Sequence, residues 1–469
     1  MNIAIVHYHL KPGGVTNVIK HQIEALSDQC EVLLITGELA DPPIHGNTIQ
    51  IPGLGYNAGS ATFPHPEKTA DTLSQKISSV FGDECDLLHI HNPTLAKNNH
   101  FLAILKSMQQ KGYRLFLQVH DFAEDGRPLA YYSNEPYIAN CHYGTINSRD
   151  YRLLLQSGLK TEGLHLLPNT VDPISKKSEK PINKSRILYP VRAIRRKNIG
   201  EAILLSFFFS GKTLSITLPP NSPADMKSYN GWKDFVLENN LDVEFESGLH
   251  TDFQTLISSS AFIISTSITE GFGFSFLEPW TAEKMLWGRS IPVICSDFQK
   301  NGVHLNHLYQ RLHVPISWIG EDALISTFMS CFSVNSKKFN VEINEKQTQN
   351  FFLNKIESGA IDFGLLSEYF QKKVISKVLS NKRNKELIIR FNPYLTKPGF
   401  ACNDTKLISN NKKAVLQNYS KTIYKNNLIK IYKKIINYSV THCIDKNILA
   451  SYFLKPDNFS LLKWDDYVE

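Results

Sequence analysis

Two glutamates, Glu270 and Glu278, frame a glycine-containing turn in the stretch TEGFGFSFLEPW. The preceding run, SAFIISTS, is apolar with strand propensity, and the following run, LEPWTAEKML, has helical spacing. The turn is therefore predicted at the carboxyl edge of a buried strand, where open α/β sheets bind ligands. Gly271 and Gly273 free the backbone amides of the turn, and the positive end of the following helix would add to their effect. This arrangement suits a polyhydroxyl ligand joined to a diphosphate.

Two other interpretations of the paired glutamates stay open. Glutamates after a strand can be solvated or can cap the next helix, and this structural role is as compatible with the pattern as ligand binding is. Paired carboxylates also carry out glycoside hydrolysis. Hydrolases, however, do not need a neighbouring cationic cradle for a diphosphate.

Such cationic groups occur in the stretch YPVRAIRRKN, where Arg192 and Lys197 follow a predicted strand. Two cations converging at a strand end suit a diphosphate, because arginine pairs two oxygens at once and lysine acts as a point charge. A solvated basic loop explains the same stretch equally well when it is considered alone.

A double glycine, Gly13-Gly14, separates the first predicted strand from the first predicted helix. Glycines there let the backbone approach a ligand closely, and the helix N-terminus attracts an anion. Many strand-to-helix turns carry glycines for geometry alone, so the signal is weak. The stretch also lacks the dinucleotide fingerprint G-x-G-x-x-G, which argues against a dehydrogenase.

The stretch LQVHDFAEDGRP places His120 at the end of an apolar strand, directly before Asp121. An imidazole at a strand end can hydrogen-bond a sugar hydroxyl or a phosphate oxygen. Asp121 could orient it, or accept a hydrogen bond from a substrate. Asp125 and Arg127, farther along the same loop, are candidate contacts for an acceptor. A histidine after a strand is nevertheless more often structural.

Around these stretches, short apolar runs alternate with amphipathic ones, which predicts parallel sheets with right-handed crossovers. The polar segment DPISKKSEKPINKS is predicted to be a linker, and after it the pattern restarts, with SIPVICSD as its last strand. The fold class is therefore α/β, with two doubly wound Rossmann-like domains and a cleft expected between them. The predicted domains are residues 1–175, 183–313 and a mostly helical extension, 314–469, part of which should pack back on the first domain.

Within the extension, one predicted helix places Tyr424, Leu428, Ile431, Ile435 and Tyr438 near one face and carries several lysines. A basic amphipathic helix can bind membranes. Packing of that face against the first domain, with the lysines solvated, is the favoured interpretation, because such a pattern usually marks a core face.

Composition narrows the choice of function. The chain has 469 residues, which favours two or three domains, and a formal net charge of +7, which fits an anionic ligand but does not argue for nucleic acid. The seven cysteines lack metal-ligand spacing and are odd in number, so a reduced, cytoplasmic compartment is expected. The first residues resemble a strand rather than a signal peptide, and no apolar run is long enough to span a bilayer.

Taken together, the motifs resemble those of retaining glycosyltransferases of the GT-B fold, in the large family-4 group. EGFGFSFLE resembles that group's E-x7-E signature, VRAIRRKN its phosphate loop, and GGVTNVI its N-terminal glycine loop. DLLHIHN, VHDF and LLPNTVD fall in the expected order between them. The resemblance covers about residues 1–310. It implies transfer of a hexose from a nucleotide sugar, UDP- or GDP-linked, to a hydroxyl acceptor, with retention and without a metal or other cofactor.

The resemblance also implies roles for the donor-binding residues. Glu278 would accept hydrogen bonds from the nucleotide ribose. Glu270 would hold hydroxyls of the transferred sugar, helped by the backbone amides of Phe272, Gly273 and Phe274. No enzymic nucleophile is expected, because the acceptor attacks from the face that the leaving group departs.

The remaining roles concern the diphosphate and the first domain. Arg192 and Lys197 would neutralise the diphosphate in place of a divalent metal. The Gly13-Gly14 pair would approach the diphosphate or the reacting sugar, and His120 would contact the donor sugar. The partners implied are a nucleotide sugar and a hydroxyl-bearing acceptor, with no nucleic acid and with peripheral membrane contact through basic surface as an option.

Two departures from the family pattern point to a specialised branch. The residues after the second glutamate include two tryptophans and Arg289, which is expected to be buried, and the loop HDFAEDGRP is long and charged. They leave the acceptor open, as well as the base, the sugar and the oligomeric state. Two alternative functions remain: a GT-B-fold epimerase acting on the nucleotide sugar, and a protein that binds a nucleotide sugar without turnover.

Overall fold

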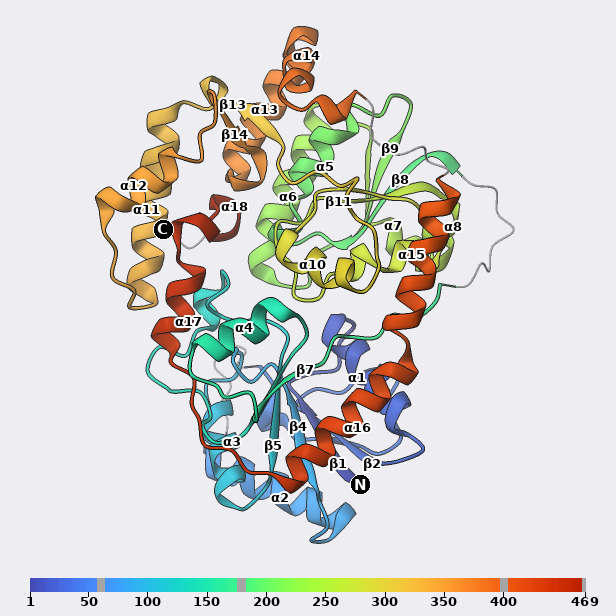
Figure 1. The fold of residues 1–469 in the computed structure, drawn as a ribbon, viewed down its shortest axis with the longest axis vertical. Coiled ribbons are helices and arrows are strands. Elements are labelled where there is room, and N and C mark those ends of the chain that lie inside the picture. Colours follow the sequence, from blue (N-terminus) through green and yellow to red (C-terminus); the bar gives the residue numbers. More distant parts are fainter. Residues whose placement is uncertain (57–63, 175–182, 397–403, 466–469) are drawn as a thin grey trace. The chain divides into compact units, whose positions relative to one another are not determined.

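The computed structural model describes residues 1–56, 64–174, 183–396 and 404–465 of the chain (Figure 1). The chain forms two compact units. Unit 1 comprises Met1–Thr170, Lys338–Val341 and Tyr419–Phe453, and unit 2 comprises Val171–Lys337, Glu342–Asn418 and Leu454–Glu469. The predicted linker falls largely on residues 175–182, which lie outside the described residues.

Unit 1 is built on a seven-stranded parallel sheet of strand order β3-β2-β1-β4-β5-β6-β7. Its strands are β1 (Asn2–His7), β2 (Glu31–Thr36), β3 (Thr48–Gln50), β4 (Leu87–His91), β5 (Leu115–Val119), β6 (His142–Thr145) and β7 (Leu164–Leu166). The central strands β4 and β5 are buried along their whole length, as expected for a parallel sheet with helices on both faces. The strand order reverses between β1 and β4, which makes that point the topological switch.

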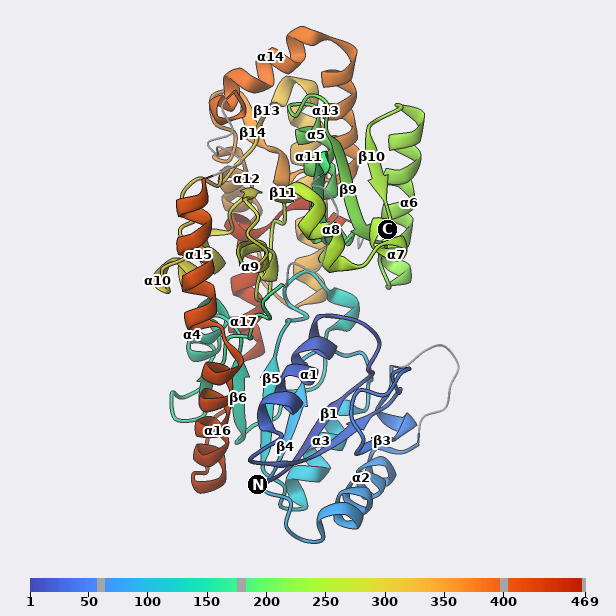
Figure 2. The same cartoon turned by 90° about the vertical axis from the view of Figure 1, so that its right-hand side faces the viewer.

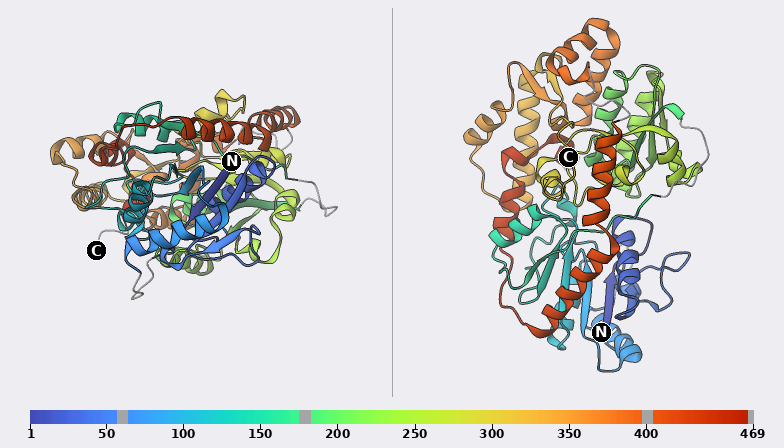
Figure 3. Two further views of the ribbon diagram at one scale, coloured as in Figure 1. Left: turned by 90° about the horizontal axis from the view of Figure 1, so that it is seen from below. Right: turned by 45° about the vertical axis from the view of Figure 1, so that its right-hand side comes forward.

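Helices cover both faces of this sheet and bury a separate apolar core on each. They are α1 (Gly14–Leu26), α2 (Pro66–Phe81), α3 (Phe101–Gln110), α4 (Ser148–Gln156), α16 (Lys421–Asn437) and α17 (Lys446–Phe453), with the 3-10 turns η1 (Pro52–Leu54) and η2 (Pro128–Ala130). Two of these helices, α16 and α17, come from the C-terminal part of the chain. Helix α16 lies along α1 on one face of the sheet (Figures 1 and 3).

The apolar face of α16 is buried in this core, as the favoured interpretation predicted. Tyr424, Leu428, Ile431 and Ile435 are all buried, whereas Tyr438 follows the helix end and is 65% exposed. Lysines of α16 pair with acidic residues of α1: Lys421 with Glu24 at 2.5 Å, and Lys425 with Asp28. The chain itself therefore covers the face that the membrane interpretation would require.

Unit 2 repeats the same winding with a five-stranded parallel sheet of order β10-β9-β8-β11-β12. Its strands are β8 (Asn183–Arg192), β9 (Thr213–Leu218), β10 (Val243–Phe245), β11 (Ser260–Ser265) and β12 (Leu286–Gly288), and β13 (His313–Pro315) and β14 (Ala360–Asp362) form a separate antiparallel pair. The switch point lies between β8 and β11. Both doubly wound sheets were predicted from the alternation of apolar and amphipathic runs, and the α/β fold class is confirmed.

Most helices of the C-terminal third belong to unit 2. The helices of this unit are α5 (Ile199–Ser206), α6 (Pro223–Glu238), α7 (Ser247–His250), α8 (Phe253–Ser259), α9 (Glu278–Thr281), α10 (Pro292–Lys300), α11 (Glu321–Lys338), α12 (Glu345–Leu353), α13 (Glu368–Ser380), α14 (Lys382–Phe391), α15 (Thr405–Asn418) and α18 (Leu461–Trp464). Its 3-10 turns are η3 (Arg195–Lys197), η4 (Phe274–Phe276), η5 (Ile316–Trp318), η6 (Phe363–Leu365), η7 (Pro393–Leu395) and η8 (Pro456–Asn458). Figure 2 shows α6 beside β9 and β10. Tyr229 of α6 packs edge-on against Phe245 of β10.

Two local predictions in unit 2 are wrong. SIPVICSD was predicted to be a strand, but Pro292 begins helix α10 there and the strand precedes it as β12. A short apolar run does not separate a strand from a buried helix, and proline at the first helical position is the signal that was available. The helix predicted over LEPWTAEKML is limited to the four-residue α9, which follows a 3-10 turn, so its dipole adds little to the turn.

Two remaining sequence expectations concern cysteines and membrane spans. The six cysteines that the structure describes are all free thiols, and Cys402 lies outside the described residues. In the described part of the chain, no helix combines the length and the apolar character that crossing a bilayer requires.

Candidate functional site

The loops that follow β8 and β11 meet at the switch point of unit 2 and are tied together by hydrogen bonds. The Tyr189 hydroxyl donates to the Lys197 carbonyl at 2.5 Å, and the Thr266 hydroxyl donates to the Asn198 carbonyl at 3.0 Å. The Ile268 amide donates to the Arg196 carbonyl at 3.0 Å. These bonds place the predicted phosphate loop directly against the loop that carries Glu270.

Lys197 and Glu270, both predicted site residues, form an ion pair with 2.5 Å between Nζ and Oε1. Glu270 is only 6% exposed. Burial would raise the pKa of Glu270, but Lys197 and Arg196 outweigh it and hold that pKa below its ordinary value. Glu270 is therefore ionised at neutral pH and can accept hydrogen bonds.

Glu278 differs from Glu270 in its surroundings. Its carboxylate accepts no hydrogen bond from any of the described residues, and it is half-buried. Burial, together with repulsion from Asp172, raises the pKa of Glu278 to about 7, and Lys197 partly offsets the rise. Two carboxylates thus share the field of one lysine, and Glu278 retains its capacity to accept hydrogen bonds.

Arg192, the last residue of β8, is half-buried and donates from Nη1 to the Pro219 carbonyl at 2.9 Å. Burial lowers the pKa of its guanidinium from the ordinary value, and the group stays protonated at neutral pH. The Pro219 bond fixes the direction of the guanidinium and uses only one of its five N–H groups. The remaining donors suit an anion at this sheet edge.

The turn between the two glutamates requires glycine at one position. Gly273 has φ of 94°, and a Cβ there would lie 3.0 Å from Phe276 and 3.2 Å from Ile294. The amides of Gly273 and Phe274 precede the first hydrogen bond of η4 and donate to no acceptor in the described part of the chain. Phe272 packs edge-on against Phe274 at 4.9 Å between ring centroids. The turn therefore offers backbone hydrogen-bond donors, and the packed phenylalanine rings hold it rigid.

Arg289, expected to be buried, holds an ionic network behind the phosphate loop. Its guanidinium pairs with Glu201 at 2.6 Å and with Asp362 at 2.7 Å, and the Tyr309 hydroxyl donates to Glu201 at 2.6 Å. Glu201 Oε2 also accepts a hydrogen bond from the side-chain amide of Asn198 at 2.7 Å. Asn198 has a left-handed φ of 53° directly after Lys197, so this network fixes the turn that ends the phosphate loop.

In unit 1 the corresponding loop follows β1 and carries the predicted Gly13-Gly14 pair. Gly14 is the first residue of α1, and a Cβ built there meets no atom within 4 Å. The Thr16 hydroxyl donates to the Lys11 carbonyl at 2.6 Å and closes the loop. The fold of the chain alone does not require glycine at position 14, and the open space in front of it is compatible with a ligand.

His120 lies at the end of β5, on the other side of the unit 1 switch point, and is buried. The Asn92 side chain accepts from the His120 amide at 2.7 Å and from the Asp121 amide at 3.2 Å. Asn92 itself has a left-handed φ of 52° directly after β4. Burial lowers the pKa of His120 to about 4, although Asp121 opposes this shift, so the imidazole is neutral.

The three predicted acceptor residues lie in two separate ion pairs. Asp121 pairs with Arg127 at 2.9 Å, with both side chains about one quarter exposed. Asp125 instead faces Arg149 at 3.7 Å, and Arg149 bonds Asp150 at 2.7 Å. The structure thus brings Asp121 and Arg127 together and leaves Asp125 with a buried arginine.

Sequence reasoning overlooked several polar residues around these sites. Arg196 contributes to the field at Glu270, and the basic run IRRKN was the signal for it. Glu124, in the His120 loop, is completely buried, accepts from the Tyr137 hydroxyl at 2.9 Å, and has its pKa raised by burial to about 7. The alternation HIH in β4 was the available signal for a buried imidazole cluster. In the described ranges, no three His, Cys, Asp or Glu side chains are arranged to hold a metal ion.

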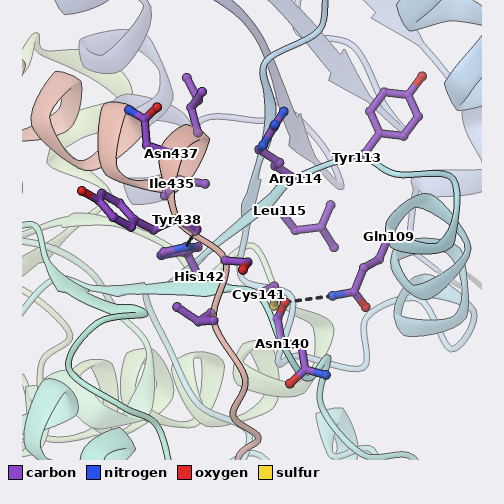
Figure 4. Close-up of a pocket in the computed structure, with 13 residues that line it drawn as sticks. Gln109, Tyr113, Arg114, Leu115, Asn140, Cys141, His142, Ile435, Asn437 and Tyr438 are labelled. Carbon is purple, nitrogen blue, oxygen red and sulfur yellow. Dashed lines mark hydrogen bonds between the residues drawn. The ribbon is translucent and has the colours of Figure 1, made fainter.

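A cavity of about 380 Å³ lies at the opposite edge of the unit 1 sheet, where β5 and β6 begin (Figure 4). Its lining includes Arg114, His142 and Tyr438, and the His142 ring bonds the Tyr438 carbonyl at 2.8 Å. This edge carries none of the predicted site residues. Because ligands of doubly wound sheets bind at the carboxyl ends of the strands, the candidate site lies at the other edge.

Known proteins resemble this chain in sequence or in fold. Mannosylglucosyl-3-phosphoglycerate synthase of Petrotoga mobilis is 28% identical over 418 residues, which cover 79% of this chain and 80% of the relative. HepE of Anabaena, solved in complex with UDP-glucose, has a TM-score of 0.54 at 12% identity over 92% of this chain and 99% of HepE. A glycosyltransferase from Rickettsia africae ESF-5 has a TM-score of 0.54 at 12% identity over 93% of this chain and 98% of that chain. No protein-family model matches the chain.

Proposed function

We propose that this chain, an enzyme with the GT-B fold of the glycosyltransferases, transfers a hexose from a nucleoside diphosphate sugar to a hydroxyl acceptor, with retention of configuration and without a metal ion. The observation that carries the proposal is the charge arrangement at the unit 2 switch point. There Arg192, Lys197 and Glu270 lie at adjoining strand ends, beside a Glu278 carboxylate that still has free acceptor capacity.

The leaving group of such a reaction is a nucleoside diphosphate, whose negative charge grows as the glycosidic bond breaks. Preorganised cations at the place where charge develops lower the barrier more than any flexible group would. Arg192 and Lys197 are both held in position by other residues, so little reorganisation is needed. They take the part that a divalent cation plays in other enzymes.

The sugar and the ribose need acceptors and donors rather than charge neutralisation. The ionised Glu270 accepts hydrogen bonds from sugar hydroxyls, and the amides of Gly273 and Phe274 donate to sugar or phosphate oxygens. Glu278 accepts from the ribose. The pairing of Glu270 with Lys197 favours this hydrogen-bonding role over nucleophilic attack, which supports a mechanism in which the acceptor attacks from the face of the departing group.

The roles proposed for unit 1 fall to one neutral side chain, one backbone segment and one ion pair. His120 contacts the donor sugar, and the backbone at Gly14 approaches the donor without steric hindrance from a side chain. Asp121 and Arg127 orient the acceptor. The name of the Petrotoga mobilis relative gives a first acceptor to try, glucosyl-3-phosphoglycerate, with a mannosyl donor, since its product is a mannosylglucosyl-3-phosphoglycerate.

The test is release of nucleoside diphosphate from a panel of UDP-, GDP- and ADP-sugars in the presence of a metal chelator, with and without the acceptor. The wild type is expected to act on one donor, and Glu270→Ala to lower its kcat/KM by roughly 100- to 1,000-fold. Glu357→Ala is the matched control, because it removes a carboxylate that is also ion-paired, with Arg311, but is half exposed. It should keep wild-type activity.

Three results would overturn parts of the proposal. An unchanged rate in Glu270→Ala removes the assigned site. Activity that is lost with the chelator and restored by a divalent cation removes metal independence. NMR of the product that shows the opposite anomeric configuration to the donor removes retention.

A further inference from the structure

A chain of buried hydrogen bonds links His120 to helix α16 within unit 1. Its members share one property, which is that each is at most 5% exposed. In order, the bonds are His120 Nε2 to His91 Nδ1 at 2.8 Å, His91 Nε2 to Gln22 Oε1 at 3.0 Å, Gln22 Nε2 to the Tyr424 hydroxyl at 2.8 Å and to Gln118 Oε1 at 2.8 Å, Gln118 Oε1 to His89 Nε2 at 2.9 Å, and His89 Nδ1 to the Tyr432 hydroxyl at 2.7 Å.

The secondary structure explains why these groups meet. His89 and His91 alternate on β4 and so point to the same face, where their rings stack at 4.5 Å. The register of β4 and β5 sets His91 beside Gln118, and Gln22 reaches the pair from α1. Helix α16 closes the far end with two tyrosine hydroxyls.

The three imidazoles of this hydrogen-bond network, those of His89, His91 and His120, are neutral. Burial lowers the pKa of His89 to about 3 and that of His120 to about 4, and it holds the pKa of His91 well below the ordinary value. A neutral imidazole has one nitrogen that donates and one that accepts. The direction of one bond therefore determines the direction of the next.

The amide groups set that direction. Gln118 Oε1 is the common acceptor for His89 Nε2 and Gln22 Nε2, so the amino group of Gln22 faces Gln118 and Tyr424. The carbonyl oxygen of Gln22 then faces His91 and can only accept, so His91 Nε2 carries the proton. His91 Nδ1 must accept, and it receives the proton of His120 Nε2.

We propose that Gln22, His91 and Tyr424 are positioning residues that hold His120 in the tautomer protonated on Nε2, so that Nδ1 presents a lone pair to a hydroxyl of the donor sugar. The tautomer itself is a property of the chain alone, and only the partner of Nδ1 rests on the proposed function. No hydrogen bond reaches His120 Nδ1 from any residue that the structure describes. A hydroxyl group, which is a donor, suits this position, whereas a phosphate oxygen does not.

The opposite arrangement is chemically complete and must be tested. If both amides turned over, every bond in the chain would reverse, and His120 would carry its proton on Nδ1. The buried group without a partner would then be the Gln118 carbonyl oxygen instead of its amino nitrogen. The two arrangements make opposite predictions for a single nitrogen atom.

Nitrogen NMR of the full-length protein labelled with ¹⁵N-histidine distinguishes them without any substrate, and His120→Asn assigns the signals. The expected result at pH 7 is an unprotonated shift for His120 Nδ1 and a protonated shift for Nε2. A protonated Nδ1, or shifts averaged over both tautomers, would overturn the proposal.

Variants test whether the network causes the tautomer. Gln22→Met keeps the side-chain length but removes both the acceptor for His91 and the donor to Tyr424. It is expected to shift His120 toward a mixture of tautomers and to lower kcat/KM by about 10- to 100-fold. Tyr143→Phe is the matched control, since it deletes a buried tyrosine hydroxyl of the same unit that donates to the Ile138 carbonyl outside the network, and both quantities should stay at wild-type values.

Unchanged ¹⁵N shifts in Gln22→Met would overturn the proposal, whatever the activity. If Gln22→Met does not fold, Tyr424→Phe takes its place with a smaller expected shift, and the wild-type measurement stands alone. Failure of the proposed function is distinguishable, because it would appear as absent hexosyl transfer with the Nε2 tautomer intact.

Discussion

The two units share the same winding order, yet they fill their switch points with opposite kinds of polar group. Beneath the strand ends of unit 1 lie neutral imidazoles and amides, linked through His91 and Gln22. Beneath those of unit 2 lie full charges, in the Lys197–Glu270 pair and the Arg289 network. The same winding thus accommodates a neutral network in one unit and a charged network in the other, and helices as well as strands supply the residues.

The difference matches the charge of the two parts of the proposed substrate, the diphosphate and the sugar. A diphosphate needs positive charge that is already in place, and buried ion pairs hold such charge rigidly. Sugar hydroxyls are uncharged, so orientation of donors and acceptors is sufficient for them. Neutral groups also cost less to bury than charges do, provided that they are hydrogen-bonded.

Acidification should separate the two units, and this is the largest effect we expect. In unit 1 burial lowers the pKa of His7, His89 and His165 to about 3 and that of His120 to about 4. The unfolded chain binds these protons near pH 6.5, so stability is present above that pH and is lost as the pH falls toward the folded pKa values. Each imidazole contributes about 1.4 kcal/mol per pH unit in that window.

Unit 2 should lose less stability than unit 1 between pH 7 and 5. Burial raises the pKa of Glu124 in unit 1 and of Glu278 in unit 2 to about 7, so these two carboxyls act alike, and the difference comes from the buried imidazoles of unit 1. All five tryptophans lie in unit 2, so their fluorescence reports on that unit alone, while circular dichroism reports on both. Thermal unfolding should coincide by the two probes at pH 7, and at pH 5 the dichroism should change first. Coincident transitions at pH 5 would contradict the comparison.

Breaking the charged design of unit 2 should cost nearly as much. Arg289→Met leaves Glu201 and Asp362 buried without their common partner, which is expected to lower the free energy of unfolding by about 3–5 kcal/mol. Chemical denaturation followed by tryptophan fluorescence measures it. The control is Arg311→Met, which breaks an ion pair whose side chains are about half exposed and should cost no more than about 1 kcal/mol. Equal losses in the two variants would show that burial of the network is unimportant.

The smallest effect concerns Glu278, the carboxyl of unit 2 that titrates near neutrality. Below its pKa of about 7 the group is protonated and is a weaker hydrogen-bond acceptor for a ribose hydroxyl. Affinity for the nucleoside diphosphate should therefore rise roughly fivefold from pH 6 to pH 8, which corresponds to about 1 kcal/mol for a charged over a neutral hydrogen bond. Calorimetric titration of the wild type and Glu278→Gln measures it. The variant should show no such rise, and an equal rise in both would assign it to another group.

Much of this architecture could be predicted from the sequence. Apolar alternation predicted both sheets, and the motifs around Arg192, Lys197, Glu270 and Glu278 predicted which strand ends would carry charge. The GT-B fold inferred from those motifs is confirmed. These inferences succeeded because each depends on residues that are close together in the sequence, at positions that topology brings to one sheet edge.

The alternation HIH in β4 indicated buried imidazoles, but their partners could not be predicted, because these contacts are distant in the sequence. His89 bonds Tyr432, and Gln22 bonds Tyr424, across more than 300 residues. Nothing in the local pattern of α16 distinguishes these tyrosines from ordinary core residues. The partners of Arg289 were hidden in the same way, since Glu201 and Asp362 lie on opposite sides of it in the chain.

The division of unit 1 between the start and the end of the chain also affects its synthesis. The sheet of unit 1 emerges from the ribosome early. Helix α16, which shares an apolar core with Ile19 of α1 and Leu34 of β2, is complete only when residue 437 has been added. Until then this apolar face of the nascent chain stays open, and such exposed surface is prone to aggregation. A truncated gene that ends near residue 418 should for that reason yield insoluble protein, although every strand of both sheets has been translated.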